Sequence, residues 1–291
     1  MRPPVQRSQM IGLLEADAGS AVVLSVADAL LGGGSAERLQ VLACGTSRSE
    51  ASLPWEPCLG DEMAVLPYHR AQEAVAEVTK FHGERLNGRR SLVGLGVALC
   101  DGIVSQAVLL GGDVVVVARG PLLSGAVLSE VVGRCQLPTC VVAEGFGGSI
   151  RKVGVAIDFA EGSAALLERA MVIASNLGVE LVPVHAARAE VEGERRGSGG
   201  GEAKRFEQLL GQLELPFGAA YATRNLLQPL EVVRGEPSEA LQAWASTAPV
   251  DLVVVGSGAA GRPVLSPGQV CSALIEAFPV ALWVEQLGNR E

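Results

Sequence analysis

The sequence lacks the features expected of a nucleic-acid-binding protein. Acidic residues outnumber basic ones and give a formal net charge of −9, so no broad basic face for nucleic acid or an anionic membrane is expected. Aromatic residues make up only 4% of the chain, which leaves few rings for stacking on bases. Charged residues are also sparse, at 19% against 48% hydrophobic residues, which is typical of a globular chain that buries a core.

Long apolar runs and paired cysteines are also lacking. The most apolar stretch, 92–117, is interrupted by aspartate, serine and glutamine, and the apolar run at 10–14 is followed at once by acidic residues. The six cysteines form no CxxC pair, and no second pair of ligands stands near Cys135 and Cys140. We therefore expect a cytoplasmic, soluble protein with reduced thiols, no metal site and no membrane insertion.

What the chain does contain is a regular alternation of short apolar runs and helical patterns. A continuous run of apolar, often β-branched residues is typical of a parallel strand buried on both faces. Ten such runs lie at 10–14, 39–44, 92–97, 113–117, 138–142, 152–157, 180–185, 230–233, 252–255 and 279–284. Helical patterns separate most of them, so the sequence predicts an α/β protein with doubly wound parallel sheets.

The order of these elements occurs twice along the chain. The segment that begins at Glu15 recurs at Asp158, 143 positions later, and the apolar run that begins at Asp113 recurs at Asp251, 138 positions later. Offsets that change so little across half a chain indicate an internal duplication.

A glycine-rich segment, 145–149, separates the two copies. We therefore predict two tandem Rossmann-like domains, 1–145 and 150–291. The charged, glycine-rich stretch 187–204 is predicted to be a loop within the second of them.

The stretch after the strand at 252–255 has the composition of a phosphate-binding loop. Gly256, Gly258 and Gly261 allow backbone N–H groups to approach an anion closely. Ser266 is predicted to be the N-cap of the following helix, with a proline at the first helical position behind it.

The same glycines also match GxGxxG, the dinucleotide-binding pattern, with Glu285 as the acid that binds the ribose. This interpretation would make the protein an NAD(P)-dependent enzyme. However, the motif lies in the last strand–helix unit instead of the first, and Arg262 and Pro263 prevent a helix from starting directly at the third glycine.

Together, these segments resemble the universal stress protein family in its tandem two-domain form. The resemblance rests on 153–170 with Asp158 at a strand end, on the glycine–x–proline helix start in 234–241, and on 251–261 followed by the closing strand at 279–284. It implies an adenine nucleotide alpha-hydrolase-like fold.

The resemblance also implies a nucleotide site in the second half, for ATP accompanied by Mg²⁺ or for a related adenine nucleotide. The carboxylate of Asp158 would bond the ribose or the adenine edge, and the backbone of Val184 would meet the adenine. The phosphates would be surrounded by Gly256, Gly258, Gly261 and Ser266. The phosphate motif of the family closes with a glycine and then a serine or threonine, and here Cys271 stands in place of that glycine, before Ser272.

In the first half, the equivalent positions are Glu15 and the loop 118–121, which lacks the glycine pair. We expect this half to bind no nucleotide. The resemblance further implies that the two halves form an intramolecular pseudo-dimer to which the strands at 138–142 and 279–284 contribute. It also allows a homodimer of the whole chain.

The resemblance implies a stress-response or signalling module, with a protein partner that is unknown. Paired catalytic carboxylates and a Cys/His dyad are not apparent, so efficient catalysis is not expected. The alternative from another functional class is a regulatory module related to the paired cytoplasmic tail domains of cation/proton antiporters, which would sense a ligand or serve as a structural surface.

Overall fold

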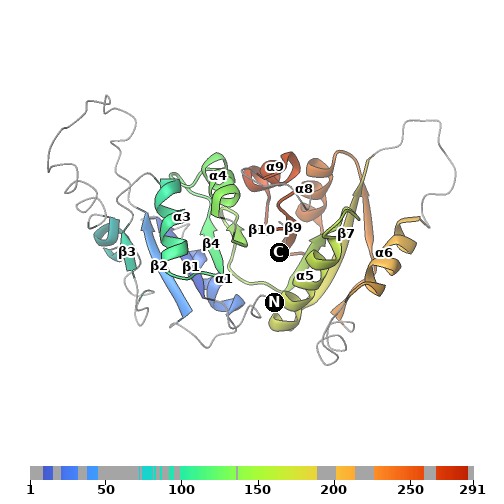
Figure 1. Cartoon of the computed structure of the whole chain (residues 1–291), viewed down its shortest axis with the longest axis horizontal. Helices are drawn as coiled ribbons and strands as arrows, with labels where there is room; N and C mark the ends of the chain where they lie inside the picture. The colour runs from blue at the N-terminus through green and yellow to red at the C-terminus, as the bar shows by residue number, and fades with distance from the viewer. Residues whose placement is uncertain are drawn as a thin grey trace.

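The computed structural model describes residues 9–15, 21–31, 38–44, 72, 74–80, 82, 86, 92–94, 99–135, 137–188, 201–213, 226–258 and 267–287. Within these residues strands and helices alternate (Figure 1). The strands are β1 (Met10–Glu15), β2 (Leu39–Cys44), β3 (Leu92–Gly94), β4 (Val114–Ala118), β5 (Thr139–Val142), β6 (Lys152–Ala156), β7 (Glu180–Ala187), β8 (Glu231–Arg234), β9 (Leu252–Gly256) and β10 (Ala281–Glu285). The helices are α1 (Val22–Leu30), α3 (Leu99–Leu109), α4 (Gly125–Cys135), α5 (Ser163–Leu177), α6 (Gly201–Gly211), α8 (Pro237–Thr247) and α9 (Gln269–Ala277).

All these strands belong to one sheet in the order β3-β2-β1-β4-β5-β10-β9-β6-β7-β8. Each half has the same order, with its first strand at the centre and its fifth at the seam, and all pairings within a half are parallel. Only β5 and β10 pair antiparallel, with Trp283 opposite Cys140. The doubly wound α/β fold predicted from the apolar runs is confirmed, and the strands expected between the halves are neighbours.

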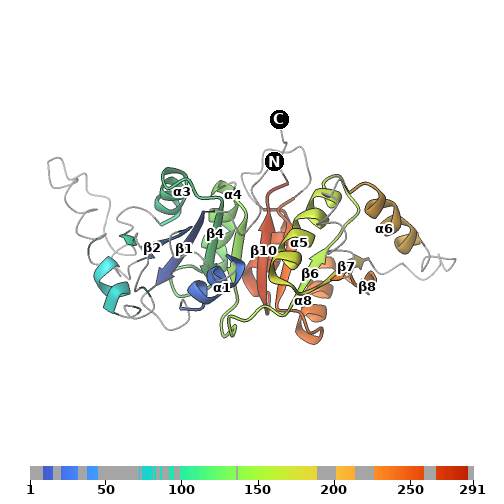
Figure 2. The same cartoon turned by 90° about the horizontal axis from the view of Figure 1, so that it is seen from below.

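Helices cover both faces of the sheet, and each face has its own apolar layer (Figure 2). Successive strand residues point to opposite faces, so Met10 joins the layer under α1, α5 and α6, whereas Ile11 joins the layer under α3, α4, α8 and α9. Both layers contain residues from both halves. The hydrophobic core is therefore continuous across the seam.

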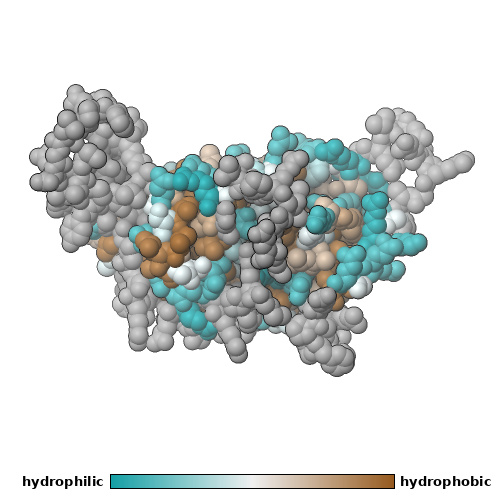
Figure 3. Space-filling view, in the orientation of Figure 1, coloured by the Kyte–Doolittle hydropathy of each residue, from teal (hydrophilic) through white to brown (hydrophobic). Residues whose placement is uncertain are grey.

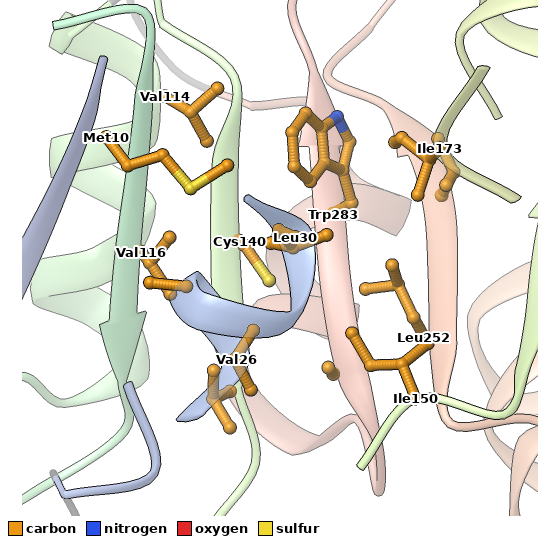
Figure 4. Packing of buried hydrophobic residues seen from close by; sticks show 14 of the residues in the cluster. Met10, Val26, Leu30, Val114, Val116, Cys140, Ile150, Ile173, Leu252 and Trp283 are labelled. Carbon is orange, nitrogen blue, oxygen red and sulfur yellow. The ribbon is translucent and has the colours of Figure 1, made fainter. Parts of the chain in front are cut away.

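Trp283 of β10 is the largest fully buried side chain at this seam. In Figure 4 it lies beside Cys140 of the neighbouring strand, with Leu30 and Val26 of α1 close by. Its indole Nε1 donates a hydrogen bond of 2.9 Å to Oε2 of Glu285. The indole therefore joins the halves by packing while its polar group is satisfied.

Two helices also pack across the seam, α4 against α9. A Cβ on Gly125 would lie 2.7 Å from the Cα of Glu276, so only glycine allows this approach. Beside it, the guanidinium of Arg119 donates to the backbone oxygens of Glu276, at 2.6 Å, and Phe278, at the C-terminal end of α9. Burial lowers the pKa of Arg119 from its ordinary value, against the opposing effect of the charge on Glu144.

Some element ends differ from the prediction. Helix α6 begins at Gly201, inside the stretch predicted to be a loop, because the glutamate, alanine and lysine that follow this glycine favour a helix. The helix expected over about 70–86 is helical at each of its described residues, 72, 74–80, 82 and 86, and the irregular segment at 45–67 lies outside the described residues. No helix in the described part of the chain is long and apolar enough to cross a membrane.

Candidate functional site

A cavity of about 490 Å³ opens at the C-terminal ends of β6 and β9. β6 and β9 are neighbours in the sheet, but the chain leads from β6 to β7 on one side and from β9 to β10 on the other. The two connections therefore diverge and open a crevice between the ends of these strands. The walls come from the loop after β6, the residues after β9, the first turn of α9, and parts of α5 and α8. Open α/β sheets generally bind ligands at this place, and the volume suits a small-molecule site.

Asp158 lies in the cavity wall, directly after β6. Its Oδ1 accepts hydrogen bonds of 2.9 Å from the N–H of Ala160 and from the hydroxyl of Ser163, the first residue of α5. The carboxylate is exposed. Asp158 thus shapes the turn into α5 through one oxygen and also presents an anionic acceptor to the cavity.

Ser257, the residue after β9, carries a hydroxyl that finds no partner in the part of the chain that the structure describes. Its backbone is fixed on both sides: its N–H donates to the oxygen of Glu285 at 2.9 Å, and its C=O accepts from the N–H of Gly268 at 2.8 Å. The residue lines the cavity and is 1% exposed, and its Oγ finds no hydrogen-bond partner within the described residues. A buried hydroxyl left in this state is destabilising, so a polar ligand atom could satisfy it.

The two glycines beside Ser257 serve different purposes. A Cβ on Gly256 would lie 2.5 Å from Cδ1 of Leu287, so a larger residue there would force that side chain to move. Of the atoms in the described part of the chain, a Cβ on Gly258 would have only the N of Gly268 within 4 Å, at 3.9 Å. Gly258 therefore leaves space free at the cavity wall, as the predicted phosphate-binding role requires.

Val184, whose backbone was predicted to meet the adenine, lies within β7 and is not among the residues that line the cavity. Its carbonyl accepts the N–H of Ile157 at 2.8 Å within the parallel ladder. Ala186, two residues later, lines the cavity instead. The prediction ended this strand at residue 185, whereas β7 continues to Ala187, so the cavity is reached one pleat later.

The predicted N-cap at Ser266 is wrong. Gly268 occupies the N-cap of α9 in an extended conformation, and its oxygen accepts the first intrahelical bond, from the N–H of Ser272 at 2.9 Å. The N–H of Gly268 is bonded to the oxygen of Ser257, so α9 begins only at the next residue, Gln269. Pro267 therefore precedes the N-cap, while Gly261 and Ser266 themselves lie outside the described residues.

Two side chains near the cavity, Glu285 and Cys271, are respectively bonded to other protein groups and uncharged. The carboxylate of Glu285 accepts from Trp283 and lies 3.5 Å from Nε of Arg169, instead of facing the cavity as a ribose-binding acid would. Burial raises the pKa of the Cys271 thiol to about 12, so this part of the wall is neutral at physiological pH. Within the described residues no cluster of three or more His, Cys, Asp or Glu could hold a metal ion.

The corresponding place in the first half is filled by the protein itself. The side chain of Glu15, 2% exposed, accepts the N–H groups of Leu122 and Leu123 at 3.1 and 3.0 Å. The methylene that distinguishes it from Asp158 lets it cross to the loop after β4.

Sequence reasoning identified Asp158, Gly256 and Gly258 in the wall and missed Ser257 and Ala186. The only signal for Ser257 is its position between two glycines directly after a buried strand.

Comparisons with known proteins agree with this architecture. A model of the universal stress protein family matches residues 149–284. A Pseudomonas aeruginosa structure assigned to the universal stress proteins is 14% identical, with a TM-score of 0.62, and the match covers 98% of this chain and 95% of that one. A universal stress protein from Archaeoglobus fulgidus is 16% identical, with a TM-score of 0.60 and 97% coverage of both chains. No curated protein matches the chain significantly. Residues 149–284 therefore form a domain of the universal stress protein family.

Proposed function

We propose that the second half binds ATP or a related adenine nucleotide and that the protein acts as a stress-response or signalling module without efficient catalysis. The observation that carries this proposal is the cavity at the strand switch point, with Asp158 in its wall and the hydroxyl of Ser257, which has no partner among the described residues. Residues 1–145 would form the half that binds no nucleotide.

The wall offers groups suited to each part of such a ligand. Asp158 is an acceptor for ribose hydroxyls or for an adenine amino group. The apolar side chains of Leu241 and Leu274 provide a surface for a base. Ser257, Gly258 and the start of α9 offer a hydroxyl and backbone near a helix N-terminus, where an anion is favoured. Mg²⁺ prefers oxygen ligands and would be held mainly by the phosphates.

Titration of the purified protein with ATP, AMP, cyclic AMP and NAD tests the proposal. We expect an adenine nucleotide to raise the Tm and to give a calorimetric binding signal. In Asp158→Ala the affinity falls by about 10-fold, because a hydrogen bond to a charged acceptor is lost. If none of the four ligands binds at millimolar concentration, the proposal fails; stabilisation by NAD alone would favour the dinucleotide-dependent enzyme instead.

Ser257→Ala separates binding from stability. Removing a buried hydroxyl that has no partner among the described residues raises the free energy of unfolding by about 1 kcal/mol, whereas nucleotide affinity falls by about 5-fold, since the ligand loses a donor. Urea denaturation and calorimetry measure the two effects.

Ser129→Ala is the matched control, because Ser129 Oγ on α4 also lacks a partner in the described part of the chain but lies outside the cavity. It should gain stability without any change in affinity. Equal affinities of wild type and Ser257→Ala would remove Ser257 from the site.

A second candidate is the regulatory module related to antiporter tail domains. It is favoured by α3, where Val108 and Leu109 are 66% and 75% exposed and apolar surface is visible (Figure 3). Copurification of a membrane antiporter with the tagged protein would support this function. Failure to capture one, together with nucleotide binding, would favour the first proposal.

A further inference from the structure

The Glu15 carboxylate is bound as a free anion would be bound. Its two oxygens accept one hydrogen bond each from the successive N–H groups of Leu122 and Leu123, at 3.1 and 3.0 Å. Both amides belong to the loop between β4 and α4, which corresponds in the repeat to the loop between β9 and α9 at the second-half cavity. Successive backbone N–H groups aimed at one carboxylate form the kind of concavity that proteins use to hold anions.

The surrounding loop is shaped around this carboxylate. A Cβ on Gly120 would lie 2.6 Å from Oε1 of Glu15, so a larger residue would collide with it. On the other side, Nε2 of His82 lies 2.9 Å from the backbone oxygen of Glu15 and holds the end of β1. Burial raises the pKa of the Cys44 thiol, opposite Glu15 in β2, and the negative charge on Glu15 raises it further.

We infer that Glu15 is a built-in anionic ligand: its carboxylate occupies an oxyanion-binding loop of the first half, formed around the N–H groups of Leu122 and Leu123. The comparison with Asp158 supports this inference. Asp158, at the repeated position, bonds within its own loop, to Ala160 and Ser163. The anion-binding loop of the first half is therefore occupied by a side chain of the protein itself, whether or not the second half binds a nucleotide.

The occupied loop also supports the rest of the molecule. Arg119, three residues before Leu122, donates to the backbone oxygens at the C-terminal end of α9. The opposite end of α9 lines the second-half cavity. A fixed anion in the first half thus holds the loop that supports the helix of the candidate site.

Chemical rescue tests the inference. Glu15→Ala deletes the equivalent of one acetate ion and leaves the N–H groups of Leu122 and Leu123 without their acceptor. We expect the Tm to fall by roughly 5–10 °C, because buried donors lose their partners. Sodium acetate should restore at least half of this loss, whereas sodium chloride at the same ionic strength should not, and wild type should have the same Tm in both salts. Rescue by inorganic phosphate in place of acetate also supports an oxyanion site if phosphate raises the Tm of Glu15→Ala more than that of wild type.

Asp158→Ala is the matched control at the repeated position. Because Asp158 is exposed and bonds within its own loop, acetate should leave the Tm of this variant unchanged. The inference is wrong if acetate and chloride give Glu15→Ala the same Tm, if Glu15→Ala is as stable as wild type, or if acetate stabilises both variants equally.

Should Glu15→Ala fail to fold in chloride, the refolding yield in acetate relative to chloride replaces the Tm comparison, and equal yields contradict the inference. Glu15→Gln provides a second variant that fills the site with a neutral side chain. It should have a lowered Tm that acetate does not restore, and rescue by acetate would count against the inference.

Discussion

Trp283→Ala is expected to lower the free energy of unfolding by about 4–5 kcal/mol, at the upper end of the range for truncating a buried aromatic side chain. The indole is completely buried at the seam where β5 and β10 pair. Its removal leaves a cavity between the halves that α1 cannot fill without moving. It also deprives the buried Glu285 of the N–H that it accepts at 2.9 Å. Urea denaturation followed by far-UV circular dichroism measures the change.

Trp283→Phe separates the two contributions. The phenyl ring retains most of the packing but donates no hydrogen bond, so a loss of about 1–2 kcal/mol is expected. Because the apolar layers on both faces contain residues from both halves, we expect one unfolding transition in each variant. A loss below 1 kcal/mol in Trp283→Ala would contradict the seam as a main source of stability.

The architecture could be predicted from the sequence because buried parallel strands leave a direct signal. Runs such as 113–117 and 252–255 are apolar without alternation, and their recurrence at nearly constant spacing revealed the duplication. The pairing of β5 with β10 followed from the repeat and the family resemblance. These features depend on local composition and order, which a single sequence contains.

Element ends and side-chain partners were less predictable because they depend on contacts between distant segments. The start of α9 was placed at Ser266 from capping preferences, but the hydrogen bond from Gly268 to Ser257 sets the N-cap at Gly268. Similarly, the sequence shows that Glu15 is one methylene longer than Asp158. Only the fold shows that this length brings its carboxylate to Leu122 and Leu123.

The same distinction applies within the candidate site. Asp158, Gly256 and Gly258 could be placed in its wall because strand ends and glycines are visible in the sequence. The unpartnered hydroxyl of Ser257 could not, because serine is as common in solvated turns as in buried walls. Its backbone bonds to Glu285 and Gly268 hold it inside the cavity.

Gly258→Leu is expected to abolish nucleotide binding, with an affinity at least about 100-fold below that of wild type. Among the described residues, a Cβ at this position meets only the N of Gly268 within 4 Å, so a side chain there can enter the cavity without displacing any of them. The backbone of Gly258 does not have a positive φ, so a leucine causes no strain there. The Tm without ligand should therefore change by less than about 2 °C, as for a substitution outside the packed core. Calorimetry with ATP and thermal denaturation measure the two effects.

Two further substitutions decide whether the effect comes from filling the cavity. Gly147→Leu introduces the same side chain at an exposed glycine with no neighbour within 4 Å, and it should leave affinity unchanged. Gly256→Ala should instead lower the Tm, because its Cβ would lie 2.5 Å from Leu287 and that side chain must move. Wild-type affinity in Gly258→Leu would place the nucleotide outside this cavity. Loss of binding in both leucine variants would show a general effect on folding, and only the pattern of blocked binding with unchanged Tm assigns the ligand to the loop after β9.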